Sequence, residues 1–241
     1  MLPWLPPHPV GFPPVKQALR EPDGLLAAGG ELSPDWLRCA YRRGIFPWFA
    51  PGEPILWWSP DPRLVLFPDE IHVRRSLAKR LRNAGFTVTF DHAFSTVIDA
   101  CAAPREEHAG TWITPEMRHA YCRLHAEGVA HSVEVWRDGE LVGGLYGIGL
   151  GGVFFGESMF SRVADASKVA LVHLARHLSA HGGQLIDCQV HTPHLASLGA
   201  RRIARSTFID YLDQYTEGHG SPMPWSSSTA NHLPVEEPKP T

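Results

Sequence analysis

The segment AHSVEVWRDGELVGGLY, which spans residues 130–146, decides the fold class of this 241-residue chain. Residues 130–136 and 140–146 predict two strands, and Asp138-Gly139 between them is a strong signal for a tight hairpin turn. A further strand is expected directly after the hairpin, at residues 152–155. The segment therefore predicts a meander of antiparallel strands.

The residues around the meander complete the predicted domain. Residues 166–180 predict a helix ended by Gly182-Gly183, residues 184–190 predict a strand, and residues 198–200 predict a turn. This order indicates an α+β chain whose larger domain, residues 63–215, is acetyltransferase-like (GNAT-like) with a mixed sheet. Upstream, we expect strands at 63–67 and 86–90 and helices at 72–82, 93–102 and 115–126, the last capped by Thr114.

Proline dominates the N-terminal region, where 14 of the 22 prolines lie within the first 68 residues. Because proline fixes φ and lacks a backbone donor, this region is expected to form neither a regular sheet nor a long helix. One helix is expected at residues 35–43, with Ser33 as its cap, Pro34 at its first position and Gly44 at its end. We therefore expect a small irregular N-terminal domain at residues 1–62.

Composition and patterning exclude several classes of protein. The first residues lack the charged start and apolar run of a signal peptide, and no stretch approaches the roughly 18 apolar residues of a membrane span. The four cysteines are scattered without a C-x-x-C pair, which indicates reduced thiols. We expect a cytoplasmic protein with no membrane contact. Residues 216–241, rich in Ser, Pro and Gly, predict a disordered tail with no share in the chemistry.

The formal net charge of −3 excludes a basic field over the whole protein but not a local one. Residues 72–82 hold five basic side chains and no acid. This segment is either a solvated helix face or a patch that contacts phosphates, because a few Lys and Arg contacts supply most of the non-specific affinity for nucleic acid. The five residues are Arg74, Arg75, Lys79, Arg80 and Arg82.

Two familiar motifs are present only in weak form, and a third is absent. Residues 147–152 match the G-x-G-x-x-G spacing of a dinucleotide site, but they lie between two expected strands, so a tight turn explains them better. His173 and His177 lie one helical turn apart without the glutamate of an H-E-x-x-H zinc site, which favours an ordinary helix surface. No G-x-S-x-G elbow is present. We expect no metal.

Polar residues in two otherwise apolar strands are candidates for chemistry. Glu157 lies at the end of an apolar strand, and Asp187 and Gln189 stand two apart on a strand that is expected to be buried. Residues i and i+2 share a face of a strand, so Asp187 and Gln189 are expected to point one way and Cys188 the other. Because a buried carboxylate needs a partner, the two acids are either structural ion-pair partners or a binding site.

Nine short motifs follow one another along the chain. They are DGLLAAGG (23–30), RGIFPW (43–48), WWSP (57–60), GTWIT (110–114), AHSVE (130–134), GESMFS (156–161), ASK (166–168), LIDCQ (185–189) and SLGA (197–200). In this order and at this spacing they resemble the leucyl/phenylalanyl-tRNA–protein transferase family over roughly residues 10–212. Nine separated motifs are far more specific than any one of them.

The resemblance implies a two-domain protein whose larger domain has the acetyltransferase-like fold. It implies transfer of Leu or Phe, and also Met, from aminoacyl-tRNA to the N-terminal amine of proteins that begin with Arg or Lys, which marks them for degradation. The expected partners are therefore aminoacyl-tRNA and such acceptor proteins. Coenzyme A and other cofactors are not expected, and the protein is expected to be a monomer.

The resemblance also implies roles for single residues. Asp187 and Gln189 resemble the family's catalytic pair, and Glu157 resembles the residue that holds an amino group in the site. The aromatic residues around the terminal adenosine correspond to Trp48, Trp112 and Tyr121.

The chemistry of these side chains agrees with the implied roles. An aminoacyl ester is already activated, so holding amine and ester in attack geometry can supply most of the acceleration. Asp187 can orient the amine and take up its proton, and Gln189 can hold Asp187 or polarise the carbonyl. Aromatic rings suit a terminal adenine, and the basic segment 72–82 suits the acceptor stem. An apolar pocket for the aminoacyl side chain is expected from Phe154, Met159 and Leu145, the last standing where related chains have methionine.

Two other functions remain open. A coenzyme A-dependent N-acetyltransferase holds pyrophosphate on a Gly-rich loop that opens a helix, whereas residues 160–167 contain no glycine and carry Asp165, an acid that repels phosphate. A non-catalytic RNA-binding module binds tRNA whether or not an amino acid is attached, whereas a transferase prefers the charged form.

Overall fold

A seven-stranded mixed sheet is the centre of the protein, for which a computed structural model describes residues 1–103, 111–216 and 223–225. The strand order is β11-β5-β10-β9-β8-β7-β6, and every neighbouring pair is antiparallel except β9 with β10. The expected α+β class with a mixed sheet is confirmed. The strands are β5 Arg63–Leu66, β6 Thr87–Phe90, β7 Ala130–Arg137, β8 Glu140–Leu150, β9 Val153–Ser161, β10 Leu185–Gln189 and β11 Arg201–Ile203.

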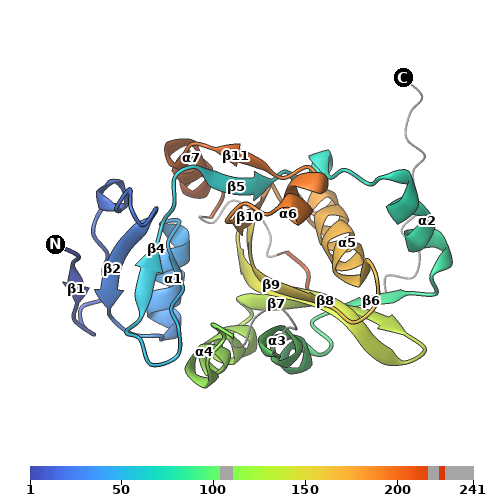
Figure 1. The fold of residues 1–241 in the computed structure, drawn as a ribbon, viewed down its shortest axis with the longest axis horizontal. Helices are drawn as coiled ribbons and strands as arrows, with labels where there is room; N and C mark the ends of the chain where they lie inside the picture. Colours follow the sequence, from blue (N-terminus) through green and yellow to red (C-terminus); the bar gives the residue numbers. More distant parts are fainter. Residues whose placement is uncertain (104–110, 217–222, 226–241) are drawn as a thin grey trace.

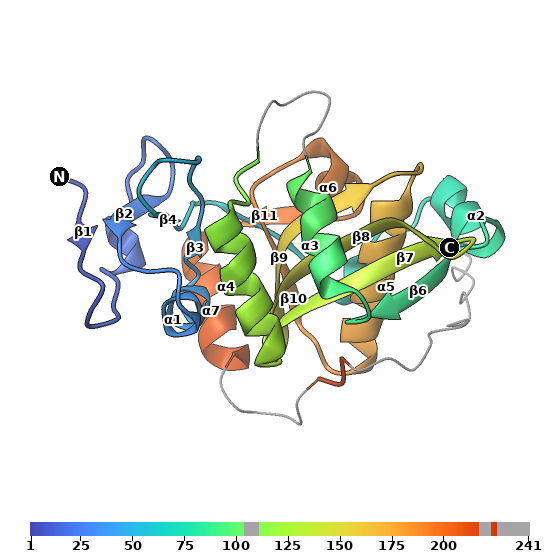
Figure 2. The ribbon, with the colours of Figure 1, turned by 90° about the horizontal axis from the view of Figure 1, so that it is seen from below.

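Helices cover both faces of this sheet (Figure 1, Figure 2). Helices α3 (Phe94–Ala102) and α4 (Pro115–Ala126) lie on one face, and α5 (Ala166–Ala180) lies on the other. Two apolar cores result, and β9 contributes to both because successive strand residues point to opposite faces: Phe155 packs in the core of α3 and α4, and Phe154 in that of α5. The other helices are α2 Arg75–Asn83, α6 Pro193–Ser197 and α7 Arg205–Tyr215, with short 3₁₀ turns at Val15–Gln17 and Pro68–Glu70.

Local sequence signals correctly predicted several elements. Asp138 and Gly139 both have positive φ, at 54° and 81°, as a two-residue hairpin turn between β7 and β8 requires. Helix α4 begins where expected, because the Thr114 side chain accepts a hydrogen bond from the Met117 backbone N–H. Helix α5 has the predicted bounds.

Strands β8 and β9 are longer than predicted, and the expected turn at residues 147–152 is only partly correct. Gly147 and Gly149 lie inside β8, and the chain reverses at Gly151-Gly152. A Cβ atom at Gly147 would overlap the Phe155 carbonyl oxygen and lie 2.6 Å from the Phe154 ring, both of the neighbouring strand. This glycine therefore makes room for an aromatic side chain across the sheet.

The N-terminal region contains a four-stranded sheet, so the expectation that it forms no regular sheet was wrong. The order is β1-β2-β4-β3, and the strands have only two to five residues. Pro47 lies in the edge strand β3, where proline is tolerated. The bounds are β1 Trp4–Leu5, β2 Leu25–Gly29, β3 Phe46–Pro47 and β4 Leu56–Trp58, and helix α1, which supplies a face that packs against α4, spans Pro34–Arg42.

Part of the expected tail packs against the body of the protein. Thr216 is buried and its hydroxyl donates to the Leu212 carbonyl oxygen in α7. Met223 and Trp225 join the core on the α5 face, because they are large apolar side chains. The predicted disorder therefore does not apply to these positions, and residues 217–222 and 226–241 lie outside the described part of the chain. None of the helices in the described ranges has the length and hydropathy of a bilayer span.

Candidate active site

A cavity opens where the two parallel strands separate. Strands β9 and β10 pair only from Leu185 beside Val153 to Asp187 beside Phe155. Beyond that point β9 continues to Ser161, whereas β10 ends at Gln189 after an irregularity in its pairing with β5. The cavity has a volume of about 1090 Å³ and is lined by both strands together with residues of β8, α3 and α5. Polar and apolar side chains thus line one cavity, at the place where the pairing of β9 and β10 ends.

The two candidate carboxyl groups lie on the same face of the sheet. Asp187 is in register with Phe155 and shares its face, and Glu157 accepts a hydrogen bond from Tyr121 of α4, so both lie on the α3 and α4 side. Gln189 has a left-handed backbone with φ of 59°, and its amide reaches Glu157. Cys188 packs with the opposite core. The predicted alternation of residues 187–189 is confirmed.

Asp187 forms an ion pair with a residue that sequence reasoning did not single out. Arg63 donates from Nε to Asp187 Oδ1 at 2.8 Å and from Nη2 to Oδ2 at 2.6 Å, and both side chains are fully buried. The backbone N–H of Gln189 donates to Asp187 Oδ1 at 2.9 Å. Both Asp187 oxygens are therefore already engaged by donors of the protein.

Arg63 is held by three further contacts, one hydrogen bond and two cation–π contacts. Its Nη1 donates to the Gly44 carbonyl oxygen at 3.2 Å. Its guanidinium lies between two rings, 4.8 Å from the centroid of Phe46 and 4.7 Å from that of Phe208. The charge of this buried arginine is thus matched by Asp187, and its apolar faces are covered. One sequence signal was available, because a charged residue at the start of the buried strand RLVL is unusual.

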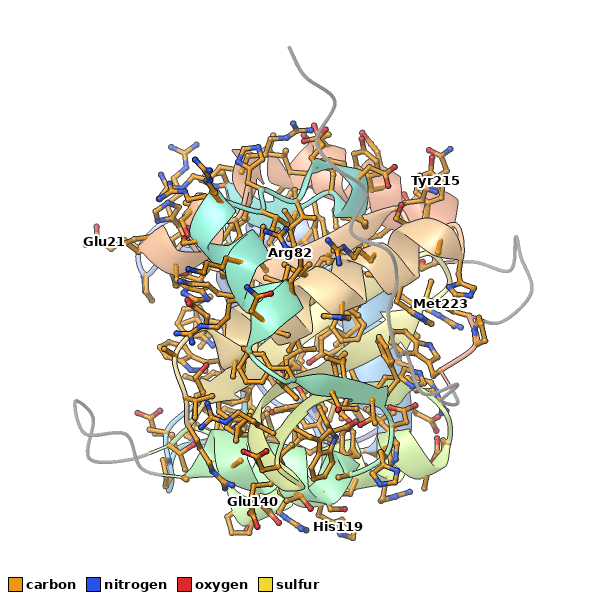
Figure 3. The ribbon with its side chains drawn as sticks, turned by 90° about the vertical axis from the view of Figure 1, so that its right-hand side faces the viewer. Glu21, Arg82, His119, Glu140, Tyr215 and Met223 are labelled. Carbon is orange, nitrogen blue, oxygen red and sulfur yellow. The ribbon has the colours of Figure 1, made fainter. Side chains whose placement is uncertain are left out.

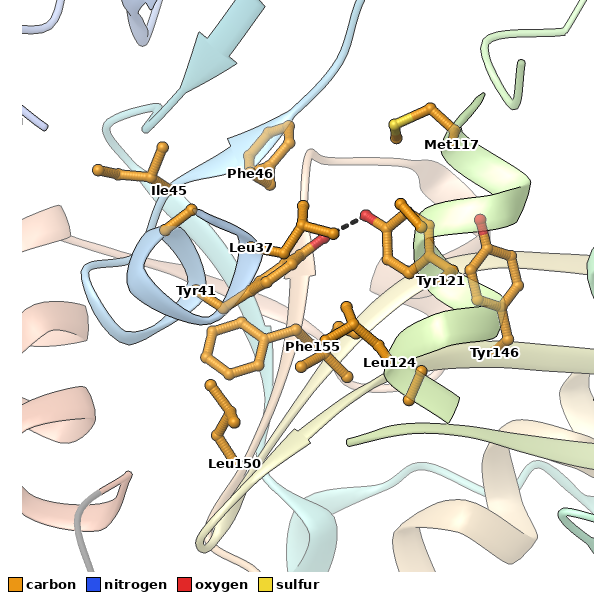
Figure 4. Close-up of a cluster of buried hydrophobic side chains, with 14 of the residues drawn as sticks. Leu37, Tyr41, Ile45, Phe46, Met117, Tyr121, Leu124, Tyr146, Leu150 and Phe155 are labelled. Carbon is orange, nitrogen blue, oxygen red and sulfur yellow. Dashed lines mark hydrogen bonds between the residues drawn. The ribbon is translucent and has the colours of Figure 1, made fainter. Parts of the chain in front are cut away.

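Glu157 is held by neutral donors. Tyr121 Oη donates to Oε2 at 2.7 Å, and Gln189 Nε2 donates to Oε1 at 2.8 Å. Tyr41 of α1 hydrogen-bonds to the Tyr121 hydroxyl, which Figure 4 shows as a dashed line. Burial raises the pKa of Glu157 to about 7, although the tyrosine and glutamine hydrogen bonds act to lower it. Glu157 is therefore a carboxyl group that can gain or lose a proton near neutral pH.

Three tyrosines around Glu157 stay protonated. Burial, followed by the Glu157 charge, raises the pKa of Tyr41, Tyr121 and Tyr146 well above the ordinary value. The Tyr146 ring packs edge-on against Tyr121 at 5.5 Å between centroids, and Figure 4 shows all three side chains together. Phenol groups that remain protonated can serve as hydrogen-bond donors to the carboxylate at any physiological pH.

The α5 side of the cavity is apolar. Leu145 of β8 lies opposite Met159 of β9, and Phe154 lies on the same face. Leu171 and Leu174 of α5 close this part, which we call the apolar lobe. Trp112 and Cys101 of α3 also line the cavity. Six expected residues and Trp112 therefore share one cavity: Glu157, Asp187, Gln189, Leu145, Phe154 and Met159.

Three groups of expected residues lie elsewhere. Tyr121 is outside the cavity lining but contacts Glu157 directly. Trp48 is half exposed in the N-terminal domain, with its ring 5.6 Å from that of Trp58, and does not line the cavity. The basic side chains lie on and just before α2, at the outer surface that Figure 3 marks with Arg82. Of these, Arg80 pairs with Asp165 at 3.7 Å.

The histidine pair on α5 has no metal-site geometry. His173 Nδ1 donates to the Val169 carbonyl oxygen of its own helix at 2.9 Å, and the His177 ring packs at a tilt against Phe90, with centroids 4.6 Å apart. Within the described ranges, no group of three or more His, Cys, Asp or Glu side chains is arranged to hold a metal ion.

The sequence matches known proteins over both domains. A family model described as leucyl/phenylalanyl-tRNA protein transferase matches residues 65–213, and a model of that family's N-terminal domain matches residues 30–61. A leucyl/phenylalanyl-tRNA–protein transferase from Chromohalobacter salexigens is 82% identical over 228 residues, which are 95% of this chain and 89% of the relative. One from Azoarcus sp. (strain BH72) is 63% identical over 95% of this chain and 97% of the relative.

Solved structures give a weaker match than the sequences do. A GCN5-related N-acetyltransferase from Kribbella flavida has 15% identity and a TM-score of 0.38, over 71% of this chain and 61% of that one. The sequence matches span most of this chain and of the relatives, at identities above 60%. They confirm the resemblance carried by the nine motifs: the chain belongs to the leucyl/phenylalanyl-tRNA–protein transferase family.

Proposed function

We propose that this transferase moves Leu, Phe or Met from charged tRNA to the N-terminal amine of proteins that begin with Arg or Lys, in the cytoplasm, and so marks them for degradation. The observation that carries the proposal is the meeting of two environments in one cavity. Glu157 offers a carboxyl group with a pKa of about 7. The apolar lobe beside it has the chemistry of a site for Leu, Phe or Met side chains.

The charged tRNA end is placed by shape and chemistry. The aminoacyl side chain enters the apolar lobe, and the terminal adenine stacks on Trp112 at the other side of the cavity. Trp48 adds an exposed aromatic surface from the N-terminal domain. The acceptor stem runs toward α2, whose exposed Arg75, Lys79 and Arg82 supply phosphate contacts.

Glu157 is the group that accepts the proton of the attacking amine. The amine nitrogen forms a bond to the ester carbonyl carbon, and the bond from that carbon to the ribose oxygen breaks. The proton leaves the nitrogen for the Glu157 carboxylate and then passes to the ribose oxygen, which departs as a hydroxyl. Asp187 is less suited to this step, because Arg63 and the Gln189 N–H already occupy its oxygens.

Asp187 instead positions Gln189. Its hydrogen bond from the Gln189 backbone N–H accompanies the left-handed conformation of that residue, and this conformation directs the amide to Glu157. Asp187 and Gln189, the pair expected to be catalytic, therefore act through Glu157. Gln189 contacts the reacting groups, and Asp187 holds Gln189 in position without contacting them.

A transfer assay tests the proposed function. The protein is incubated with radiolabelled Leu-, Phe- or Met-tRNA and with model proteins that begin with Arg, Lys or Ala, and label is followed into protein. Label is expected in the Arg and Lys proteins and not in the Ala protein. Transfer to the Ala protein at an equal rate would contradict the assignment of the acceptor.

The two rival functions give different outcomes. A coenzyme A-dependent acetyltransferase needs an anion site at the start of α5, but Asp165 lies there, held by Lys168 at 2.8 Å, so no binding of coenzyme A is expected in calorimetry. A non-catalytic RNA-binding module would bind charged and uncharged tRNA equally. We expect at least about tenfold preference for the charged form, since the apolar lobe contributes binding energy only when the amino acid is attached.

A further inference from the structure

The described part of the C-terminal segment brings a tryptophan to the α5 core. The Trp225 ring stacks on the His131 imidazole, with centroids 4.1 Å apart and planes 10° apart. It also lies 5.4 Å from His177 and 6.5 Å from Phe90. Figure 3 labels Met223, which leads into this position. A residue beyond the last helix is thus packed among side chains of β6, β7 and α5.

A glycine in the sheet leaves room for the Trp225 ring. Gly149 of β8 lies beneath it, and a Cβ atom there would stand 3.2 Å from the Trp225 ring and 3.1 Å from His131. Both distances are tighter than ordinary van der Waals contact. The absence of a side chain at this strand position therefore lets Trp225 approach the backbone of β8.

Trp225 does not line the cavity, but it packs against Phe154, which does. Its centroid lies 5.6 Å from that of Phe154, and Phe154 lines the apolar lobe. The Phe154 ring also lies against Gly147, because it would come within 2.6 Å of a Cβ atom there. The Phe154 ring therefore packs against both the β8 backbone and Trp225, and it is fully buried.

We propose that Trp225 is a specificity-determining residue, which sets the depth of the apolar lobe by holding Phe154 forward and so ranks Leu against Phe. This rests on the proposed function, in which the lobe receives the aminoacyl side chain. Trp225 does not touch the substrate. It acts because packed interiors respond to the loss of a large side chain by partial collapse into the void, which here moves Phe154 away from the lobe and enlarges it.

The test compares Trp225→Ala and Trp225→Phe in the full chain. For each, kcat/KM is measured with Leu-tRNA and with Phe-tRNA and one acceptor protein. With Trp225→Ala, the ratio of Phe to Leu transfer is expected to rise about three- to tenfold, because a deeper lobe loses contact with Leu more than with Phe. Trp225→Phe is expected to give an intermediate ratio. Trp4→Ala, an exposed tryptophan in the N-terminal sheet, is the control and should leave the ratio unchanged.

Each outcome of this comparison supports or overturns the proposed role of Trp225. Equal losses for both amino acids, or an unchanged ratio in a folded Trp225→Ala variant, would overturn the proposal and leave Trp225 as a packing residue. Should Trp225→Ala not yield folded protein, Trp225→Phe decides alone, and a ratio equal to that of the unmodified chain overturns the proposal. Failure of the unmodified chain to transfer either amino acid would contradict the proposed function itself, which is a distinct result.

Discussion

Glu157 and Asp187 project from one face of the sheet, yet their partners differ in charge. Asp187 meets the guanidinium of Arg63, whereas Glu157 meets a phenol and an amide. Neutral donors offset burial only in part, so the pKa of Glu157 rises to about 7. The sequence identified both acids but could not distinguish the ion-pair alternative from the binding alternative. Arg63 is 124 residues from Asp187, and only the fold brings them together.

The Glu157 pKa predicts a pH limb in transfer. If the ionised carboxylate accepts the proton, kcat/KM rises with pH through a midpoint near 7 and falls below it. Tyr121→Phe removes a donor that lowers the pKa, so the midpoint is expected to move upward. Glu157→Gln is expected to lower kcat by about a hundredfold or more and to abolish the limb. The measurement is a pH profile of kcat/KM for each protein.

The control for this limb is the acceptor amine, which titrates near pH 8 in rough terms. Its pKa is a property of the acceptor protein, so a limb due to the amine stays in place in Tyr121→Phe. A midpoint that does not move would therefore assign the limb to the substrate. The pH dependence of stability provides a second check of the Glu157 shift. The pKa of Glu157 in the folded protein lies above its ordinary value of 4.5. Its contribution to the free energy of unfolding is therefore fully present below about pH 4.5 and is lost as the pH rises through 7.

The sequence predicted correctly those turns and helix ends that depend on nearby residues. The Asp138-Gly139 turn and the Thr114 cap each satisfy backbone requirements within four residues, and both were found as expected. The lengths of β8 and β9 were not predictable from the sequence. Gly147 is a glycine because its neighbours on the next strand lie too close for a side chain, but in the sequence alone such a glycine indicates a turn. The N-terminal sheet was missed because its strands are too short to show a hydrophobic period.

The exposed basic residues of helix α2 are expected to contact tRNA phosphates. Changing Arg75 and Lys79 to Glu is expected to weaken tRNA binding and to lower the slope of log Kd against log salt by about 2, one for each lost phosphate contact. The matched control changes Lys16 and Arg20, two exposed basic residues of the N-terminal domain, to Glu. Filter binding over a salt series measures both. Equal weakening by the two pairs would indicate a general field and not a contact patch.

The N-terminal domain and the larger domain share one apolar core. Leu37 and Tyr41 of α1 pack with Tyr121 and Phe155 of the larger domain, as Figure 4 shows. The Tyr41 hydroxyl extends the Glu157 hydrogen-bond network into the N-terminal domain. Sequence could mark a composition boundary near residue 62, but not that the site depends on both sides of it. That dependence arises from contacts between residues 80 and more positions apart.

Arg63 pairs with Asp187 in the larger domain and also contacts Gly44 and Phe46 of the N-terminal domain. Arg63→Met leaves Asp187 buried without its counter-charge, so we expect a loss of about 3–5 kcal/mol in the free energy of unfolding by urea. The control is Arg201→Met, since Arg201 also makes a two-point pair, with Glu70, but both side chains are about half exposed; it should cost no more than about 1 kcal/mol.

The double variant Arg63→Met with Asp187→Leu separates stability from positioning. Replacing both charges by apolar groups removes the unpaired buried carboxylate, so most of the lost free energy of unfolding is expected to return. Transfer should stay low, because the Gln189 N–H no longer has the Asp187 oxygen that accompanies its left-handed backbone. Restored stability together with restored kcat would instead mean that the ion pair only stabilises the fold of the larger domain, and that Gln189 reaches Glu157 without it.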